Sequence, residues 1–293
     1  MTEFGNKNII KKAKVAAAYL SKYGYKATIA EIKKRLKDIY YPDIIFDIEE
    51  SENIDSSLHF MFLDKHIYIV LPKLLNQDQK SNICSVCDEI FNKQIYKNLS
   101  WNRILDIWWY YGESAIYFDI TNPDAQIYIY EPQSTCFEYI NKNCDQQNMH
   151  KYNNFVVWNK NKSIFWIANN WLWDAKSQIN DWRYSNNFSY PETIDIETVI
   201  NQHNPDSIKM DVEWQEYDIC KQFRNNPELL KNITNGIIEF HDLSFDQNKN
   251  SLLNFVMHIS QLWYKHKYIN SKGQNIERNK AKNDWITNLY FYK

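Results

Sequence analysis

The sequence Leu58-His-Phe-Met-Phe-Leu63, Asp64-Lys65, His66-Ile-Tyr-Ile-Val-Leu71 has the pattern of a β-hairpin. Two runs of β-branched and aromatic residues flank a short polar turn, as in paired antiparallel strands. The segments 115–130 and 154–167 repeat this pattern, with polar turns of five and four residues. Three such segments predict an antiparallel sheet built from hairpins.

The segments before, between and after these hairpins have the apolar periodicity of helices. Two helices are expected before the first hairpin, at residues 7–23 and 28–40. Further helices are expected at 82–96, 100–111, 193–202, 217–234 and 251–268. Further strands are expected at 209–214, 237–243 and 285–292. Because helices and hairpins alternate without a regular β-α-β rhythm, the sequence predicts an α+β fold, in which two N-terminal helices lead into an antiparallel sheet with helices between its hairpins. We expect one continuous domain over residues 1–293, with the polar stretch 141–153 as a candidate boundary.

Glycine is scarce and aromatic residues are abundant. The 293 residues include 5 Gly, 11 Trp, 21 Tyr and 15 Phe. The glycines lie far apart, whereas phosphate-binding loops and nucleophile elbows need clustered glycines for close backbone approach and positive φ. A P-loop, a dinucleotide-binding fingerprint and a G-x-S-x-G elbow are therefore absent from the sequence. The wealth of Asn, Lys, Ile, Tyr and Phe is typical of an AT-rich bacterial genome.

Charge is balanced overall but uneven along the chain. The net charge of −2 gives no global attraction to nucleic acid or to anionic membranes. Residues 1–38 hold ten Lys/Arg and three acids and could form a DNA-binding helix pair, although a solvated basic face beside the acidic stretch 43–55 is the alternative. The charged start of the chain and the absence of a long apolar run predict a cytoplasmic protein without membrane contact.

The cysteines and histidines do not form a complete site. Cys84 and Cys87 make the only C-x-x-C and are weak zinc candidates, but Cys87 lies on the apolar side of its helix, where cysteine packs as a small hydrophobe. Five cysteines without a disulfide pattern indicate reduced thiols. His241 ends an expected strand without a third partner. No cofactor and no structural metal is therefore predicted.

The Trp-rich segment 158–182 is the candidate interaction surface. Exposed tryptophans dominate binding hot spots, whereas buried ones would belong to the core. The candidate partner-binding residues are Trp166, Trp171, Trp173 and Trp182. With the lack of catalytic motifs, they favour a non-catalytic, cytoplasmic protein-binding protein. In general character such a chain looks like the immunity or accessory proteins that bacteria pair with secreted toxins, so the expected partner is a protein such as a toxin.

An enzyme is the alternative hypothesis. Glu113, Asp119 and Glu131 lie in or beside the second hairpin and could converge as acids that hold a divalent metal ion, which suits an enzyme acting on nucleic acid or nucleotides. Exposed strand positions would account for the same three residues. A DNA-binding regulator that acts through the basic N-terminal helices is a third alternative.

Overall fold

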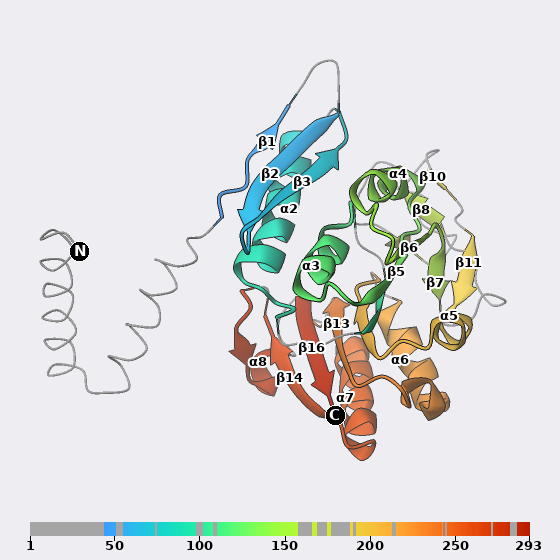
Figure 1. Cartoon of the computed structure of the whole chain (residues 1–293). Coiled ribbons are helices and arrows are strands. Elements are labelled where there is room, and N and C mark those ends of the chain that lie inside the picture. The colour runs from blue at the N-terminus through green and yellow to red at the C-terminus, as the bar shows by residue number, and fades with distance from the viewer. Residues whose placement is uncertain are drawn as a thin grey trace, which may run out of the picture. The chain divides into compact units, whose positions relative to one another are not determined.

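In the computed structural model the chain divides into two units, Met1–Ile45 and Phe46–Lys293, and the fold below is that of the second unit (Figure 1). The two expected N-terminal helices lie outside the described residues. The described residues are 44–50, 55–73, 75–97, 102–107, 110–157, 166–168, 175–176, 188–189, 192–212, 215–241, 243, 245–270, 272–281 and 286–293.

An eight-stranded mixed sheet forms the centre of the second unit. Its strands lie in the order β15-β14-β16-β13-β12-β4-β5-β6. Neighbouring strands from β6 to β13 are parallel, and β16 runs antiparallel to both β13 and β14. The bounds are β4 Arg103–Ile107, β5 Gln126–Tyr130, β6 Met149–Tyr152, β12 Ser207–Met210, β13 Asn235–His241, β14 Lys265–Ile269, β15 Asn275–Ile276 and β16 Ile286–Tyr292.

The chain enters this sheet in the middle and winds outward in both directions. From β4 it runs to β5 and β6 at one edge, then returns to β12 beside β4 and continues to β13. The strand order therefore reverses between β4 and β12, as at the switch point of doubly wound, Rossmann-like sheets. Strands buried on both faces have near-continuous apolar sequences, which is why 100–111 resembled a helix although it contains β4.

The predicted antiparallel hairpin sheet is wrong for the main sheet, because only the first of the three hairpins forms. Strands β2 (Ser56–Phe62) and β3 (Lys65–Leu71) pair as expected and, with β1 (Ile48–Glu49) beside β2, make a separate three-stranded sheet. Their turn consists of Leu63 and Asp64, one residue earlier than expected. Both have positive φ, 49° and 60°, which gives the twist of a two-residue primed turn.

The second and third predicted hairpins have other structures. Glu113–Thr121 is the helix α3, so burial of its aromatic and β-branched residues outweighs their preference for strands. In the third segment, β7 (Phe155–Val157) pairs in parallel with β11 (Thr193–Asp195). A further small sheet contains β8 Trp166–Ala168, β9 Ala175–Lys176 and β10 Phe188–Ser189.

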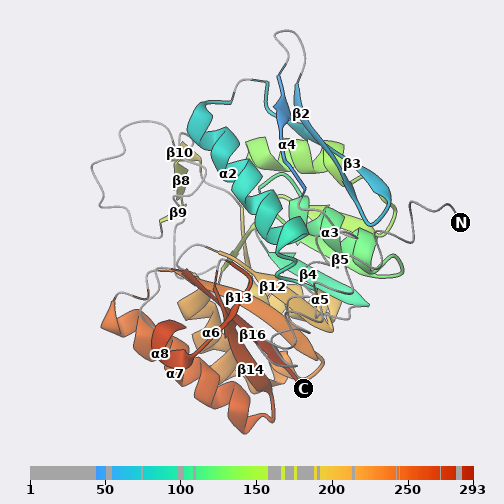
Figure 2. The ribbon, with the colours of Figure 1, turned by 90° about the vertical axis from the view of Figure 1, so that its left-hand side faces the viewer.

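Helices cover both faces of the main sheet (Figure 2). On one face α5, α6 and α7 pack with alternate strand residues, including Leu105 and Ile208, into a hydrophobic core. The opposite face is covered by α3 and the π-helical turn η1, and Asp106 on this face hydrogen-bonds Ser114 of α3. The bounds are α2 Gln77–Cys87, η1 Asp88–Asn92, α4 Ser134–Asn143, α5 Ile196–His203, α6 Glu216–Asn225, η2 Pro227–Leu230, α7 Asp246–Gln261 and α8 Arg278–Ala281. None of the helices described is both long and apolar enough to cross a bilayer.

An aromatic cluster joins the small three-stranded sheet to η1 and α3. The ring of Phe91 in η1 lies 4.8 Å from Phe60 and 5.2 Å from Phe62, both in β2. The same ring lies 5.8 Å from Tyr117 of α3. These edge-on ring contacts hold η1 in place over the main sheet.

Gly236 in β13 allows two side chains from neighbouring strands to pack closely. A Cβ at this position would lie 2.5 Å from Phe291 Cζ and 2.7 Å from Ile208 Cγ2. We expect Gly236→Ala to lower the free energy of unfolding by about 1–3 kcal/mol, as overpacked cores do. Urea denaturation measures the change, with Lys265→Ala on the exposed edge of β14 as the control. Equal stability of Gly236→Ala and the parent chain would contradict this packing.

Candidate functional site

Ionisable side chains, all of them buried except the partly buried Glu239, lie at the C-terminal ends of the central parallel strands. Asp106 lies in β4, Lys209 in β12 and Glu239 and His241 in β13, and Asp211 directly follows β12. Doubly wound sheets bind ligands outside the carboxyl ends of their strands, at the switch point of the strand order. The reversal between β4 and β12 therefore places this group where such folds bind a ligand.

Lys209 and Asp106 form a buried ion pair across the switch point. They are register partners in adjacent strands, and Lys209 Nζ lies 3.6 Å from Asp106 Oδ1. Their side chains are 2% and 1% exposed. Ser114 Oγ donates a hydrogen bond of 2.5 Å to Asp106 Oδ2. Burial raises the pKa of Asp106, while the charge of Lys209 and the bond from Ser114 oppose that shift.

Two buried glutamates each leave one carboxylate oxygen without a hydrogen bond. Glu113 begins α3, and its Oε2 accepts the N–H of Tyr111 at 3.0 Å. Glu131 follows β5, and its Oε1 accepts the N–H of Gln133 at 2.8 Å. Among the described residues, Glu113 Oε1 and Glu131 Oε2 have no hydrogen-bond partner. Because buried polar atoms are rarely left unsatisfied, a bound ligand is a physical explanation for both.

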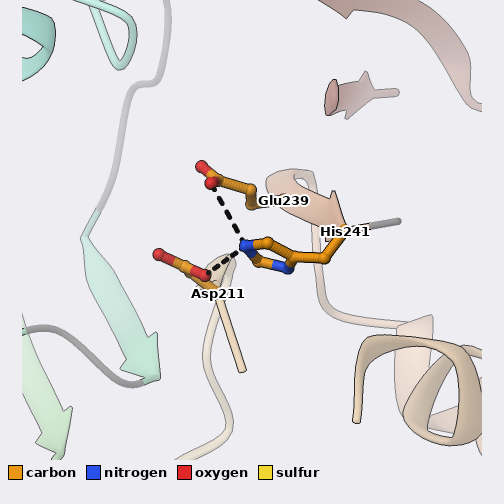
Figure 3. Close-up of side chains that lie close together, drawn as sticks. All are labelled: Asp211, Glu239 and His241. Carbon is orange, nitrogen blue, oxygen red and sulfur yellow. Dashed lines mark ion pairs between the residues drawn. The ribbon is translucent and has the colours of Figure 1, made fainter. Parts of the chain in front are cut away.

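His241 lies among three carboxylates. Its Nε2 lies 3.6 Å from Asp211 Oδ1 and 3.4 Å from Glu239 Oε1 (Figure 3). On the other side of the ring, Nδ1 lies 3.3 Å from Glu216 Oε1, which also accepts the backbone N–H of His241. Glu216 therefore orients the imidazole from the Nδ1 side, as carboxylates do for catalytic and metal-binding histidines.

This arrangement can handle a proton or a cation. Asp211, Glu239 and His241 each offer one ligand atom, and these atoms lie within 4.8 Å of one another. Two carboxylates and one imidazole are a donor set that suits a divalent transition metal. Without a metal, Nε2 between two carboxylates can accept a proton from a reacting group. In either case the site favours a positively charged ligand.

Burial and mutual repulsion change the proton affinities of the acids around His241. Burial and the charge of Glu239 raise the pKa of Asp211 to about 7. Burial also raises that of Glu239, but its hydrogen bond to His241 and the charge of His241 outweigh this and hold the pKa low. Glu89 of η1 faces the same pair, and burial and the charge of Glu239 raise its pKa to about 7. The site therefore holds more carboxyl groups than its cations can neutralise.

These shifts predict that stability falls as pH rises. Burial raises the pKa values of Glu89, Glu113 and Asp211 to about 7. Unfolded carboxyl groups titrate near pH ~4. Between pH ~4 and about 7 the folded chain therefore binds more protons than the unfolded chain, and this proton binding stabilises the fold. The stabilisation is lost as pH rises through about 7. Urea denaturation at pH 5.5 and 8 should show a lower free energy of unfolding at pH 8. Glu89→Gln should weaken this dependence; a stability that rises with pH would contradict it.

The structure brings together only two of the three acids that the sequence suggested. Glu113 and Glu131 both lie at the switch point, but buried at strand–helix junctions rather than on exposed strands. Asp119 lies farther along α3 and accepts a hydrogen bond from Asn148 at 3.0 Å. The neighbouring-strand arrangement expected for these acids is wrong, because the first of the presumed strands is a helix.

The cysteine and tryptophan candidates do not join the site. Cys84 donates to the carbonyl of Phe46 and Cys87 is buried, and burial raises the pKa of both thiols. In the described part of the chain, the group of possible metal ligands contains no cysteine. Of the tryptophans predicted to bind a partner, Trp166 lies in β8, and Trp171, Trp173 and Trp182 lie outside the described residues.

Four residues of the site were not recognisable from the sequence: Asp106, Lys209, Asp211 and Glu239. Each interrupts or follows a short apolar run, as in Ile208-Lys-Met-Asp211 and Ile237-Ile-Glu-Phe-His241. A charged residue at the end of an apolar strand is the signal that could have identified them. That signal becomes specific only when the strands are known to be parallel neighbours.

Comparisons with known proteins find resemblance only at the level of fold. No family model matches the chain, and no curated protein matches it significantly. Precorrin-6y C5,15-methyltransferase from Geobacter metallireducens GS-15 is 9% identical over 77% of this chain and 93% of that one, with a TM-score of 0.38. The plantazolicin methyltransferase BpumL in complex with SAH is 10% identical over 74% and 91%, with a TM-score of 0.38. A putative caffeoyl-CoA O-methyltransferase from Staphylococcus aureus is 13% identical over 75% and 85%, with a TM-score of 0.33. TM-scores this low do not transfer a function.

The prediction of a non-catalytic protein-binding protein of the immunity type is wrong. Methyltransferases recur among the similar structures, and the alternative of a metal-dependent enzyme for nucleic acid or nucleotides has no support there. The chain's own architecture agrees with this correction: ionisable groups are buried at the ligand-binding edge of a doubly wound sheet.

Proposed function

We propose that this chain is a methyltransferase that uses S-adenosylmethionine. The strand order supports a nucleoside site at the switch point, and the antiparallel β16 between β13 and β14 distinguishes this sheet from the dinucleotide-binding sheet of six parallel strands. A Rossmann-like methyltransferase sheet has this mixed form.

The observation that carries the proposal is the excess of buried carboxyl groups at the switch point. Asp106, Glu113, Glu131 and Asp211 are all buried there, and Lys209 forms an ion pair with Asp106. Such a site repels the phosphates of ATP or a dinucleotide and attracts a cationic ligand. S-adenosylmethionine combines a nucleoside with a sulfonium and an ammonium group, so it is the nucleoside ligand that this charge favours.

Glu131 fits the ribose of that nucleoside. In doubly wound sheets an acid about 20 residues beyond the first strand–helix turn accepts hydrogen bonds from the ribose hydroxyls. Glu131 lies at this place, after β5, and has an unpaired buried Oε2. Burial raises the pKa of its carboxyl group, and a hydroxyl donor would relieve the unsatisfied oxygen.

The first strand–helix turn fits the cofactor less well. It connects β4 to α3 through Trp108-Trp-Tyr-Tyr-Gly112. Gly112 has φ 97°, and a Cβ there would lie 2.6 Å from Cys144 Sγ, so this glycine is required for packing. In the sequence, two tryptophans directly follow β4, whereas turns of this kind carry glycine so that the backbone can approach the ligand. A turn sequence with tryptophan in place of glycine does not suit S-adenosylmethionine.

Calorimetric titration with S-adenosylhomocysteine tests the proposal. The protein is purified from the cells that naturally make it, and NAD and ATP serve as comparison ligands. We expect saturable binding of S-adenosylhomocysteine and none of NAD or ATP, because the buried acids disfavour phosphates. A folded protein that binds NAD or ATP but not S-adenosylhomocysteine would overturn the proposal.

A further inference from the structure

We propose that the tryptophans of this chain occupy glycine positions, because their codon is UGA and the cell that makes the protein reads UGA as glycine. Some genetic codes read UGA as tryptophan and others read it as glycine. The same gene therefore gives a protein sequence with tryptophan under one code and with glycine under the other. The part of the inference that concerns the cofactor turn rests on the proposed function, whereas the part that concerns Trp263 does not.

Trp263 stands at a backbone position that favours glycine. Helix α7 ends at Gln261, and the next turn closes with Tyr264 N–H on Ile259 O at 3.0 Å and Trp263 N–H on Ser260 O at 3.1 Å. This pair of bonds is the Schellman motif, whose left-handed residue is usually glycine. Trp263 occupies that place with φ 67°. A large side chain strains this conformation, since its Cβ crowds the following carbonyl.

The side chain of Trp263 gains little from burial in return. It is 89% exposed, the highest exposure among the large hydrophobic residues described as exposed. Because the indole is exposed and the helix terminus is strained, packing does not account for tryptophan at this position. Glycine would remove the strain and the exposed apolar surface together.

The turn between β4 and α3 points to glycine at two more positions. With glycine at 108 and 109 it would read Asp106-Ile-Gly-Gly-Tyr-Tyr-Gly112, a glycine-rich strand–helix turn directly after the buried Asp106. Such turns need glycine so that the backbone can approach a nucleoside ligand closely. The misfit between the turn and S-adenosylmethionine would then disappear, while Gly112 keeps its packing role.

Trp214 lies in another short connection at the site. The chain passes from Asp211, after β12, to Glu216, the first residue of α6, and both of these acids contact His241. The neighbours Val212 and Gln215 are buried. A glycine at this position of the sequence would add no side chain between residues that are already buried at the site.

The amino-acid composition and the sequence neighbours of the tryptophans indicate glycine at the other tryptophan positions as well. Average usage of about 7% would give about 20 glycines in this length, and the chain has 5 with 11 tryptophans. Asn-Gly, Asp-Gly and their reversals are strong turn signals, and replacing Trp by Gly creates one at each Trp that adjoins Asn or Asp. Those tryptophans are Trp101, Trp158, Trp171, Trp173, Trp182 and Trp285.

Peptide mass mapping of the protein from its natural source tests the inference directly. Each peptide that spans an expected tryptophan should be lighter by the mass difference between a tryptophan and a glycine residue. Codons of the gene give a second readout: UGA is expected at positions 108, 109, 214 and 263. Tryptophan masses in these peptides, or UGG codons at these four positions, would overturn the inference.

A recombinant comparison connects the inference to the site. The quadruple variant Trp108→Gly, Trp109→Gly, Trp214→Gly, Trp263→Gly should bind S-adenosylhomocysteine, whereas the chain with tryptophan should not. Trp166→Gly, within strand β8, is the control and should not create binding. Glycine in the native peptides without any S-adenosylhomocysteine binding would uphold the inference and reject the proposed function. Tryptophan in them would reject the inference and leave the calorimetric test to decide the function.

Discussion

Replacing Lys209 with methionine should destabilise the protein by about 3–5 kcal/mol, the range found when one partner of a buried ion pair is removed. Lys209 is 2% exposed and lies 3.6 Å from Asp106. Its charge also opposes the raised pKa values of Glu113 and Glu131. Without it, several buried carboxyl groups would face one another with no cation between them.

Urea denaturation of a double-mutant cycle measures this effect. Lys209→Met is compared with Asp106→Asn and with the double variant, which should recover part of the lost stability because it removes the unpaired carboxylate as well. Lys267→Met is the matched control: this lysine lies on β14, and its Nζ is 4.5 Å from the Tyr290 ring centroid. It should change the free energy of unfolding by about 1 kcal/mol or less. Additive effects of the two substitutions at the pair would show that Lys209 and Asp106 do not interact.

Local structure was predictable from this sequence because its signals act over a few residues. The β2–β3 hairpin follows from alternating residues on each side of a short turn, and only the turn moved, by one residue, to Leu63–Asp64. The candidate strands near 237–243 and 285–292 also correspond to β13 and β16. In each case neighbouring residues decide the conformation.

The main sheet was not predictable in this way because parallel pairing is non-local. Ile104 pairs with Ser207, more than a hundred residues later in the chain, and no turn residue fixes that register. A short apolar run buried on both faces has no alternation, so β4 (Arg103–Ile107) was mistaken for part of a helix. Conversely, the β-rich sequence of α3 was mistaken for a strand.

The site depends on that non-local pairing. Glu113 and Glu131 were recognised as candidate acids, but their partners Asp106 and Lys209 become neighbours only when β4 and β12 lie side by side. His241 was noticed without a partner, and the fold supplies Asp211 from a different strand. Charged residues at strand ends are thus visible in the sequence, whereas the cluster that they form follows from the strand order.

In the variant with glycine at positions 108, 109, 214 and 263, which is the parent chain for this test, replacing Glu131 with glutamine should weaken binding of S-adenosylhomocysteine by about 10- to 100-fold, equivalent to the ~1.5–3 kcal/mol of a hydrogen bond to a charged group. Glu131 uses Oε1 to accept the N–H of Gln133, which leaves Oε2 for a ribose hydroxyl. Glutamine can keep the first bond with its single oxygen, but it then presents an NH₂ donor to the ligand. The fold should therefore persist while the ribose loses its acceptor.

Calorimetric titration and thermal unfolding of the same samples separate binding from stability. Asp119→Asn is the matched control, since Asp119 is an acid on α3 that hydrogen-bonds Asn148 outside the site. Its affinity for S-adenosylhomocysteine should equal that of the parent chain. If Glu131→Gln binds as tightly as the parent with an unchanged melting temperature, Glu131 does not hold the ribose. A matching loss in both variants would instead mean that the substitutions act through the stability of α3 and β5 rather than through the ligand.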